Sequence, residues 1–349
     1  MTTGMTNARI VAVAAISIFA AGLDAVVMPK EIQTIETVST VDGFRQKAYW
    51  YAPPGTDAGR PVPLLVFLHP WSFTYEMASP RSAELAIEKG WALICPNFRG
   101  PNKTPDACGS DKVVQDILDA VAEAKRRARI DEKRIYLLGA SGGGYLALLM
   151  AGRAPEVWAG VSAWCPISDL ARWHADSIVR KNRYAQMMSA ACGGTPEEKP
   201  EEYRRRSPLA HLAAARAAGV HVDVATGIHD GHAGSVPVGH AIRAFNVLAD
   251  EKDRISEQEI ASIESSQAVP AHLAPSEKTD PWYGKRHSSI HLRRMSANAR
   301  LTLFEGAHNC CIEAAVAWLG EQRLGADVKW KMPAQTPAQD TAAATEVAK

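Results

Sequence analysis

A glycine-rich turn around Ser141 carries the clearest chemistry in the sequence. An apolar run precedes it, and Gly139 and Gly143 flank the serine in the pattern Gly-x-Ser-x-Gly, ahead of a helix-forming stretch at 145–150. A strand that turns sharply into a helix strains the serine backbone and crowds the neighbouring main chain, which glycine tolerates. The hydroxyl is then held beside the positive end of the helix. We predict that Ser141 is a nucleophile; the alternative is a glycine-rich turn without chemistry.

Two later segments offer the base and the acid that a serine nucleophile needs. Asp230 follows a strand predicted at 221–227, and His308 follows an alternating strand at 299–304. The chain order of serine, acid and histidine is that of α/β-hydrolases, and each residue comes just after a strand. We predict that His308 is the base and Asp230 the acid, with Asp223 as the rival acid.

Three more histidines, His229, His232 and His240, surround the predicted acid. A histidine cluster can bind zinc, but the spacing here repeats no known ligand set. We interpret them as hydrogen-bonding loop residues, so the sequence predicts no metal site.

The oxyanion hole needs backbone donors. The N–H of Gly142 follows the nucleophile, and a second donor is expected from the loop after a strand at 63–69. Pro70 has no N–H, so the main chain of Trp71 is the candidate; the alternative is that Trp71 is a packing aromatic.

The elements around these residues alternate between strand and helix. A hairpin is expected within 30–52, helices at 79–90 and 110–129, and a central strand at 91–96. This alternation favours a mostly parallel, doubly wound sheet with helices on both faces. We predict one α/β-hydrolase domain over residues 30–325.

Two insertions are expected to interrupt that domain. Residues 169–219 turn helical and polar, as in a cap over the nucleophile, and residues 255–294 hold several prolines beside Trp282 and Tyr283. Exposed aromatics could stack on sugar rings, although they more often form a patch under a loop. Residues 326–349, rich in Ala, Thr, Gln and Pro, are expected to be a disordered tail.

With these residues placed, the chain resembles the catalytic domain of the prolyl oligopeptidase family of α/β-hydrolases, in the subgroup with secreted esterases and acyl-sugar hydrolases. The stretches that carry the resemblance are 95–100, the turn around Ser141, 158–170, 230–237 and 304–308. The similarity runs from about Thr40 to about Gly325 and implies an acyl-enzyme mechanism, with Ser141, Asp230 and His308 matching the family triad.

The chain departs from the family pattern at two places. The family commonly places the acid three residues before a Val-Pro pair, where this chain has Ala233, so Asp230 takes the role from three residues earlier. The oxyanion strand commonly ends in His-Gly-Gly, whereas this chain has His69-Pro70-Trp71.

The amino-terminal residues resemble an export signal. Arg9 precedes a short apolar stretch at 10–23 that contains a small-residue site, Ala20-Ala21-Gly22. This pattern is typical of a secretory signal peptide over residues 1–22, with an uncleaved anchor or a buried helix as alternatives. We expect a secreted or periplasmic protein with no stable membrane association after cleavage.

Export would permit disulfides among the six cysteines. Cys95 and Cys165 lie in apolar runs and are expected to be buried thiols. Cys310 and Cys311 are expected to pack at the start of a helix. Cys108 and Cys192 are the pair to test for a disulfide.

The charge balance excludes one class of partner. The 349 residues carry 39 basic and 38 acidic side chains, a net charge of +1, so the chain has no electrostatic footprint for nucleic acid.

The sequence therefore predicts a serine hydrolase that needs no cofactor. Because no propeller-like domain accompanies the catalytic residues, we favour hydrolysis of a carboxylic ester, on a small molecule or an acylated saccharide. A small peptidase of the same family is the alternative, and a non-catalytic binding protein on this fold is a second one.

Overall fold

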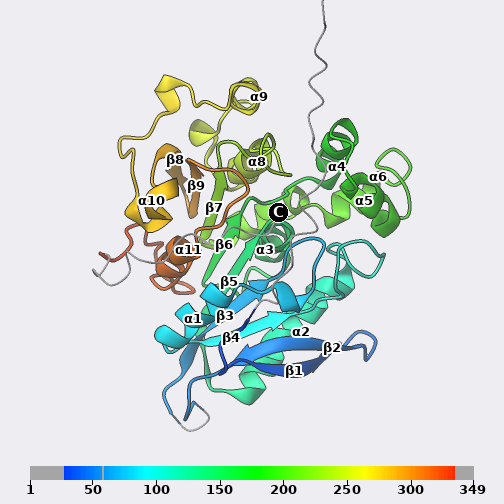
Figure 1. Cartoon of the computed structure of the whole chain (residues 1–349), viewed down its shortest axis with the longest axis vertical. Helices are drawn as coiled ribbons and strands as arrows, with labels where there is room; N and C mark the ends of the chain where they lie inside the picture. The colour runs from blue at the N-terminus through cyan, green and yellow to red at the C-terminus, as the bar shows by residue number, and fades with distance from the viewer. Residues whose placement is uncertain (1–26, 57–58, 335–349) are drawn as a thin grey trace, which may run out of the picture.

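A mixed nine-stranded sheet forms the centre of the molecule (Figure 1). The computed structural model describes residues 27–56 and 59–334. The spatial order of the strands is β1-β2-β4-β3-β5-β6-β7-β9-β8. Their bounds are β1 Gln33–Val38, β2 Arg45–Tyr51, β3 Val62–Leu68, β4 Ala92–Pro96, β5 Ile130–Ala140, β6 Gly160–Trp164, β7 Val222–Gly227, β8 Ile290–Ser296 and β9 Ala299–Phe304.

The central strands run parallel, and the edges are antiparallel. β4, β3, β5, β6, β7 and β9 pair in parallel, whereas the β1-β2 hairpin and β8 add antiparallel strands at the two edges. Strands covered on both faces are expected to be continuously apolar. Strands β4, β6 and β9 are buried at every position, which satisfies this expectation. The predicted α/β-hydrolase sheet is confirmed.

Helices cover both faces of this sheet, as predicted. α2 (Asp111–Arg127), α3 (Gly142–Arg153), α7 (Leu212–Ala217) and α8 (Gly239–Leu248) share one hydrophobic core with the sheet. α1 (Pro80–Glu88) and α11 (Ile312–Leu319) share the core on the opposite face. Figure 1 shows α1 and α11 on one side of the strands and α2 and α3 on the other.

Local sequence signals mark where helix α2 begins and ends. Ser110 caps the helix, its hydroxyl accepting a hydrogen bond from the N–H of Val113, and three basic residues occupy the last turn. Both features stabilise the ends of the helix dipole. The predicted helix at 110–129 therefore agrees with the structure to within two residues.

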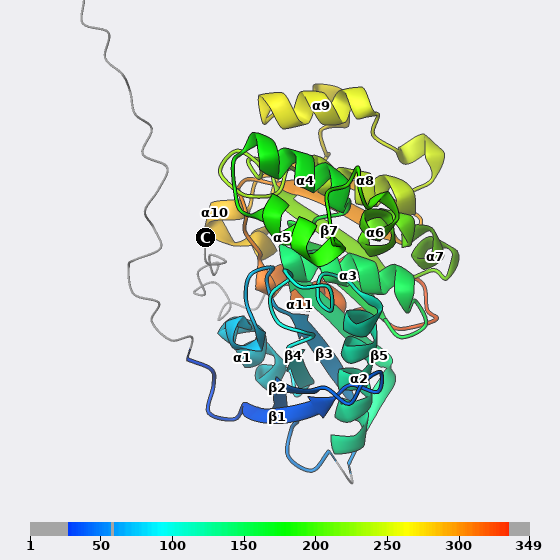
Figure 2. The ribbon, with the colours of Figure 1, turned by 90° about the vertical axis from the view of Figure 1, so that its right-hand side faces the viewer.

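The segment predicted as a cap holds four helices. α4 (Leu170–Val179), α5 (Tyr184–Cys192) and α6 (Pro200–Arg206) form one group, visible in Figures 1 and 2, while α7 packs against α3 and α8. The second predicted insertion holds α9 (Glu257–Ser266) and α10 (Gly284–His287) and reaches into edge strand β8. Trp282 and Tyr283 are 9% and 1% exposed, so they pack in the core and do not present rings to a sugar.

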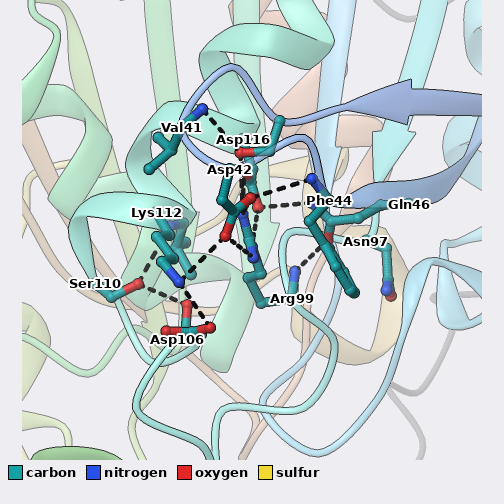
Figure 3. Close-up of polar contacts among 12 residues, drawn as sticks. Val41, Asp42, Phe44, Gln46, Asn97, Arg99, Asp106, Ser110, Lys112 and Asp116 are labelled. Carbon is teal, nitrogen blue, oxygen red and sulfur yellow. Dashed lines mark hydrogen bonds and ion pairs between the residues drawn. The ribbon is translucent and has the colours of Figure 1, made fainter.

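An ion network around the buried guanidinium of Arg99 fixes the loop that follows β4 (Figure 3). Arg99 donates from Nε to Asp116 Oδ2 over 2.5 Å and from Nη2 to Asp42 Oδ1 over 2.8 Å. Gln46 on β2 accepts from the Arg99 N–H and donates to Asp116. Because Phe98 and Arg99 both adopt a positive φ, this loop is strained. The network joins the loop to the edge hairpin and to α2.

Residues 326–334, which the sequence assigns to a disordered tail, pack against the molecule. The Trp330 ring stacks on Trp318 with centroids 6.0 Å apart, and Trp282 Nε1 donates to the Pro333 carbonyl. Apolar burial of Trp330 offsets the polar composition around it. Residues 335–349 and the predicted signal peptide, 1–22, lie outside the described residues. In the described part of the chain, no helix is long and apolar enough to cross a membrane.

All six cysteines lie in the described residues, and all are buried free thiols. Cys108 and Cys192, the pair that the sequence singled out for testing, are both free thiols in this structure. Burial raises the pKa of Cys192 to about 11 and that of Cys108 further. Buried thiols of this kind behave as small apolar side chains.

Candidate active site

Ser141 occupies the strained turn that its glycines predict. It lies between β5 and α3 with φ 58° and ψ −121°, a backbone conformation that side chains rarely adopt. A Cβ added to Gly139 would lie 2.3 Å from the main chain of Gly143, and one added to Gly143 would lie 2.1 Å from the Leu68 carbonyl oxygen. Glycine is therefore required at both positions for the strand and helix to meet this closely.

His308 and Asp230 meet although 78 positions separate them. His308 Nδ1 lies 2.8 Å from Asp230 Oδ2. The Asp230 carboxylate also accepts from the N–H groups of Gly231 and Val236, over 2.9 and 3.2 Å, and from the Thr226 hydroxyl. These donors fix the carboxylate, and the bond to Nδ1 leaves Nε2 of the imidazole for the serine.

The charge of Asp230 controls the basicity of the imidazole. Burial alone would lower the pKa of His308, but the nearby carboxylate, with a contribution from Cys165, outweighs burial and raises that pKa well above its usual value. An imidazolium is thereby stabilised, which is what a base needs after it takes a proton.

The backbone of Trp71 lies against the first turn of α3. A Cβ on Gly142 would lie 2.3 Å from the Trp71 nitrogen. The N–H of Gly142 has no partner within α3 because it begins that helix, and within the described residues the Trp71 N–H donates to no protein acceptor. Two N–H groups thus lie side by side next to Ser141, as an oxyanion hole requires.

Hydrogen bonds to a neighbouring loop fix the position of the loop that carries Trp71. The Trp71 carbonyl accepts from the N–H of Asn102 over 2.9 Å, and the His69 imidazole lies 2.9 Å from the Asn97 carbonyl through Nε2. The Trp71 ring packs between Tyr145 and Trp173. The two sequence interpretations of Trp71 are therefore compatible, since its ring packs while its main chain faces the nucleophile.

These residues open onto one cavity of about 640 Å³. The cavity is lined by Ser141 and by residues 70–73, 180, 182–184, 232–235 and 307–309. A volume of this size suits a small-molecule or short-peptide substrate.

The rival acid and the other histidines have different partners. Asp223 lies inside β7 and accepts from Arg300 Nε over 2.8 Å, with both side chains at most 2% exposed. His229 faces Glu305, His232 faces a main-chain carbonyl of α9, and His240 faces Ser168. The three histidines do not converge; His229 and His232 are hydrogen-bonding loop residues as interpreted, whereas His240 lies in α8.

A different group could hold a metal ion. Ligand atoms of Cys165, Asp230 and His308 lie within 4.8 Å of one another, the one such group among residues 27–56 and 59–334. Two of these residues, His308 and Asp230, already hydrogen-bond to each other over 2.8 Å.

Sequence reasoning missed two neighbours of the site. Cys165 was recognised as buried, but its place beside His308 was not, because its position depends on a positive φ of 46° after β6 that the sequence does not signal. Arg180 lines the cavity from the end of α4, and only the prediction of a cap over residues 169–219 hinted at such a contribution.

Comparisons with known proteins agree with this geometry. The sequence profile of the prolyl oligopeptidase family matches residues 81–264. The Bacillus subtilis uncharacterized peptidase YtmA is 27% identical over 124 residues, 35% of this chain and 46% of that protein. Acylamino-acid-releasing enzyme 1 of Oryza sativa subsp. japonica is 23% identical over 164 residues, 43% of this chain and 21% of that protein. The chain thus spans less than half the length of these relatives.

Solved structures share the fold at low identity. The acylaminoacyl peptidase of Pyrococcus horikoshii aligns with a TM-score of 0.60 at 15% identity, covering 86% of this chain and 43% of that one. A puromycin-hydrolyzing peptidase of Mycobacterium tuberculosis aligns with a TM-score of 0.58 at 17% identity, covering 87% and 41%. The family match extends over more than half of this chain, and the predicted resemblance is confirmed: the chain belongs to the prolyl oligopeptidase family of serine hydrolases.

Proposed function

We propose that the chain is a serine peptidase that hydrolyses short peptides or aminoacyl amides through an acyl-enzyme. The observation that carries this proposal is that Ser141 and His308 line one cavity while Asp230, buried behind it, lies 2.8 Å from His308 Nδ1. Several similar proteins are named as peptidases, which favours this function over the ester hydrolysis preferred from the sequence.

The geometry supports a role for each residue. His308 Nε2 takes the Ser141 proton as the hydroxyl attacks the substrate carbonyl, while Asp230 holds the imidazole and stabilises its charge. The N–H groups of Gly142 and Trp71 bind the oxyanion. The imidazolium then protonates the leaving amine, and water, activated by the same imidazole, releases the acid and restores the serine.

Fluorophosphonate labelling tests the nucleophile. The wild-type chain should be labelled quickly, and Ser141→Ala should abolish labelling and lower kcat by about 10⁵- to 10⁶-fold. Ser265→Ala on α9 is the matched control and should behave as wild type. Labelling that survives in Ser141→Ala would remove the proposed nucleophile.

A substrate panel separates peptide from ester hydrolysis. N-acetylated dipeptides and aminoacyl p-nitroanilides should be hydrolysed, and both activities should disappear in Ser141→Ala. Turnover of acylated sugars without turnover of any amide would overturn the peptidase and restore the esterase.

A further inference from the structure

The turn between α4 and α5 brings positive charge to the active-site cavity. Arg180, Asn182, Arg183 and Tyr184 all line it, and Lys181 between them adopts a positive φ of 53° that shapes the turn. Helices α4 and α5 meet at this turn within the helical group seen in Figure 2.

Arg180 has a defined position beside the acid loop. A Cβ built on Gly231 would lie 3.3 Å from Arg180 Nη2, so the guanidinium lies against the residue that follows Asp230. That loop in turn touches the base, since a Cβ on Gly234 would lie 2.8 Å from His308 Cβ. Arg180 therefore shares a wall of the cavity with the catalytic histidine.

No carboxylate of the described residues pairs with Arg180. The nearest acid on the same helix, Asp176, faces His240, its Oδ2 3.5 Å from Nε2. Across residues 27–56 and 59–334, no Asp or Glu lines the cavity. The guanidinium is thus free to bind an anion from outside the protein.

We propose that the cavity selects substrates that carry a carboxylate near the scissile bond, bound by Arg180. This inference rests on the proposed hydrolase function and names its substrate class. The Arg180 side chain is exposed, and a guanidinium matches a carboxylate with two parallel hydrogen bonds.

The dimensions of the cavity limit where that carboxylate lies. A cavity of about 640 Å³ is roughly 10 Å across, and an extended chain covers about 3.5 Å per residue, so the charge lies within about three residues of the bond at Ser141. A free peptide carboxyl terminus on the leaving-group side, or an acidic side chain on the acyl side, would supply it.

Protection of Ser141 from labelling tests the anion site without turnover. N-acetyl-dialanine should slow fluorophosphonate labelling at a concentration at least about 10-fold lower than its uncharged amide, since hydrogen bonds to charged groups are the stronger kind. Arg180→Gln should remove this difference, and Arg180→Lys should restore part of it. Equal protection by acid and amide in the wild type, or a preference that persists in Arg180→Gln, would overturn the proposal.

Turnover of matched substrates assigns the side on which the charge binds. One arm compares N-acetyl tripeptides with a free or amidated carboxyl terminus, and the other compares the p-nitrophenyl esters of succinate and butyrate. Arg180→Gln should raise KM about 10-fold for the charged member of one pair and leave the neutral members unchanged. Arg172→Gln, on α4 but outside the cavity, is the matched control.

The two proposals fail in different ways. If amides are not hydrolysed but the charge preference appears in the labelling assay, the peptidase function fails and the anion site stands. If peptides are hydrolysed with no charge preference in either assay, the anion site fails alone.

Discussion

Two histidines flank Ser141, His69 buried and His308 partly exposed, and their surroundings give them opposite properties. His69 stands at the end of β3, stacked on Phe98 with ring centroids 3.8 Å apart, and both its nitrogens face main-chain carbonyls. Burial lowers the pKa of His69 to about 4. His308 faces Asp230, and its pKa is raised well above the usual value.

The difference shows that the partner, and not burial alone, decides what an imidazole does. Two carbonyl dipoles do not offset the loss of water around a charged ring, whereas a full carboxylate charge does. Beside the proposed oxyanion hole, His69 is thus held neutral between two carbonyls, whereas His308, the proposed base, has the partner that stabilises its protonated form. Close contacts support both sides, since Gly142 meets Trp71 and Gly234 meets Asp230.

Removing the charge of Asp230 should have the largest effect on this comparison. Asp230→Asn keeps the shape but removes the charge that stabilises the imidazolium, so kcat should fall by about 10⁴-fold. The wild-type kcat/KM should fall on acidification through an apparent pKa above about 6.5, because only the neutral imidazole is a base. In Asp230→Asn this pKa should move down, measured as the acid limb of the pH-rate profile.

Asp223 provides the matched control for the acid. Asp223→Asn leaves the charge of Arg300 buried without its partner, so it should destabilise the fold by about 3–5 kcal/mol. In the fraction of Asp223→Asn that remains folded, the acid limb of the pH-rate profile should lie at the same pH as in the wild type. If Asp223→Asn shifted that limb and Asp230→Asn did not, the assignment of the acid would be reversed.

Substitutions of Gly142 and Gly234 should distinguish the loss of oxyanion stabilisation from a loss of basicity at His308. Gly142→Ala would force a Cβ against the Trp71 nitrogen and should lower kcat by about 10²- to 10³-fold, the loss expected for one oxyanion donor. Gly234→Ala would press on Asp230 Oδ1 and should lower the His308 pKa as well as kcat. Circular dichroism of both variants should match the wild type, and labelling rates measured against pH should tell them apart.

If the pH profile shifted in Gly142→Ala, or stayed unchanged in Gly234→Ala, the groups that bind the oxyanion and the groups that set the basicity of His308 would not be separate.

The sequence predicted the parts of the site that depend on local backbone geometry. Ser141 was recognisable because its glycines are required by close main-chain contacts, and β7 and β9 were recognisable by their apolar or alternating pattern. These signals placed Asp230 and His308 after neighbouring strands, which the sheet brings together. Parallel strands order functional loops along one edge, so a short pattern carries long-range information.

Other features depend on contacts that no local pattern reports. Trp330 packs on Trp318, although its neighbours in the chain resemble a disordered tail. Cys108 and Cys192 were expected in loops, but Cys192 ends α5 and both are buried free thiols. Arg180 reaches the cavity only because α4 ends above the acid loop. Each depends on tertiary packing, which overrides local composition.

His69 should make the stability of the protein depend on pH in a way that His308 does not. The folded pKa of His69, about 4, lies below the value of about 6.5 for an unfolded histidine, so the unfolded state binds the proton first. The stability that His69 contributes is present above pH 6.5 and is lost as the pH falls towards 4. The raised pKa of His308 has the opposite sign, with stability present below pH 6.5 and lost as the pH rises through the folded value.

Comparison with His69→Gln measures this contribution. Glutamine keeps one donor and does not titrate, so between pH 6.5 and 4 the wild type should lose about 3 kcal/mol of unfolding free energy relative to the variant. Urea unfolding at a series of pH values gives the difference. Parallel stability curves for the two proteins would contradict a neutral, buried His69.

The smallest effect is expected at Cys165, behind the base. Its Sγ donates to the Asn309 carbonyl over 3.2 Å, and the thiol makes a smaller contribution than Asp230 to the raised pKa of His308. Cys165→Ala should lower kcat only a few-fold and destabilise the fold by about 1–2 kcal/mol through the cavity it leaves. Because burial raises the pKa of this thiol, iodoacetamide should not inactivate the wild type. If iodoacetamide inactivated the wild type rapidly and Cys165→Ala prevented this, the sulfur would be accessible to solvent from the active site. The surroundings of His308 would then be less well packed than those of His69.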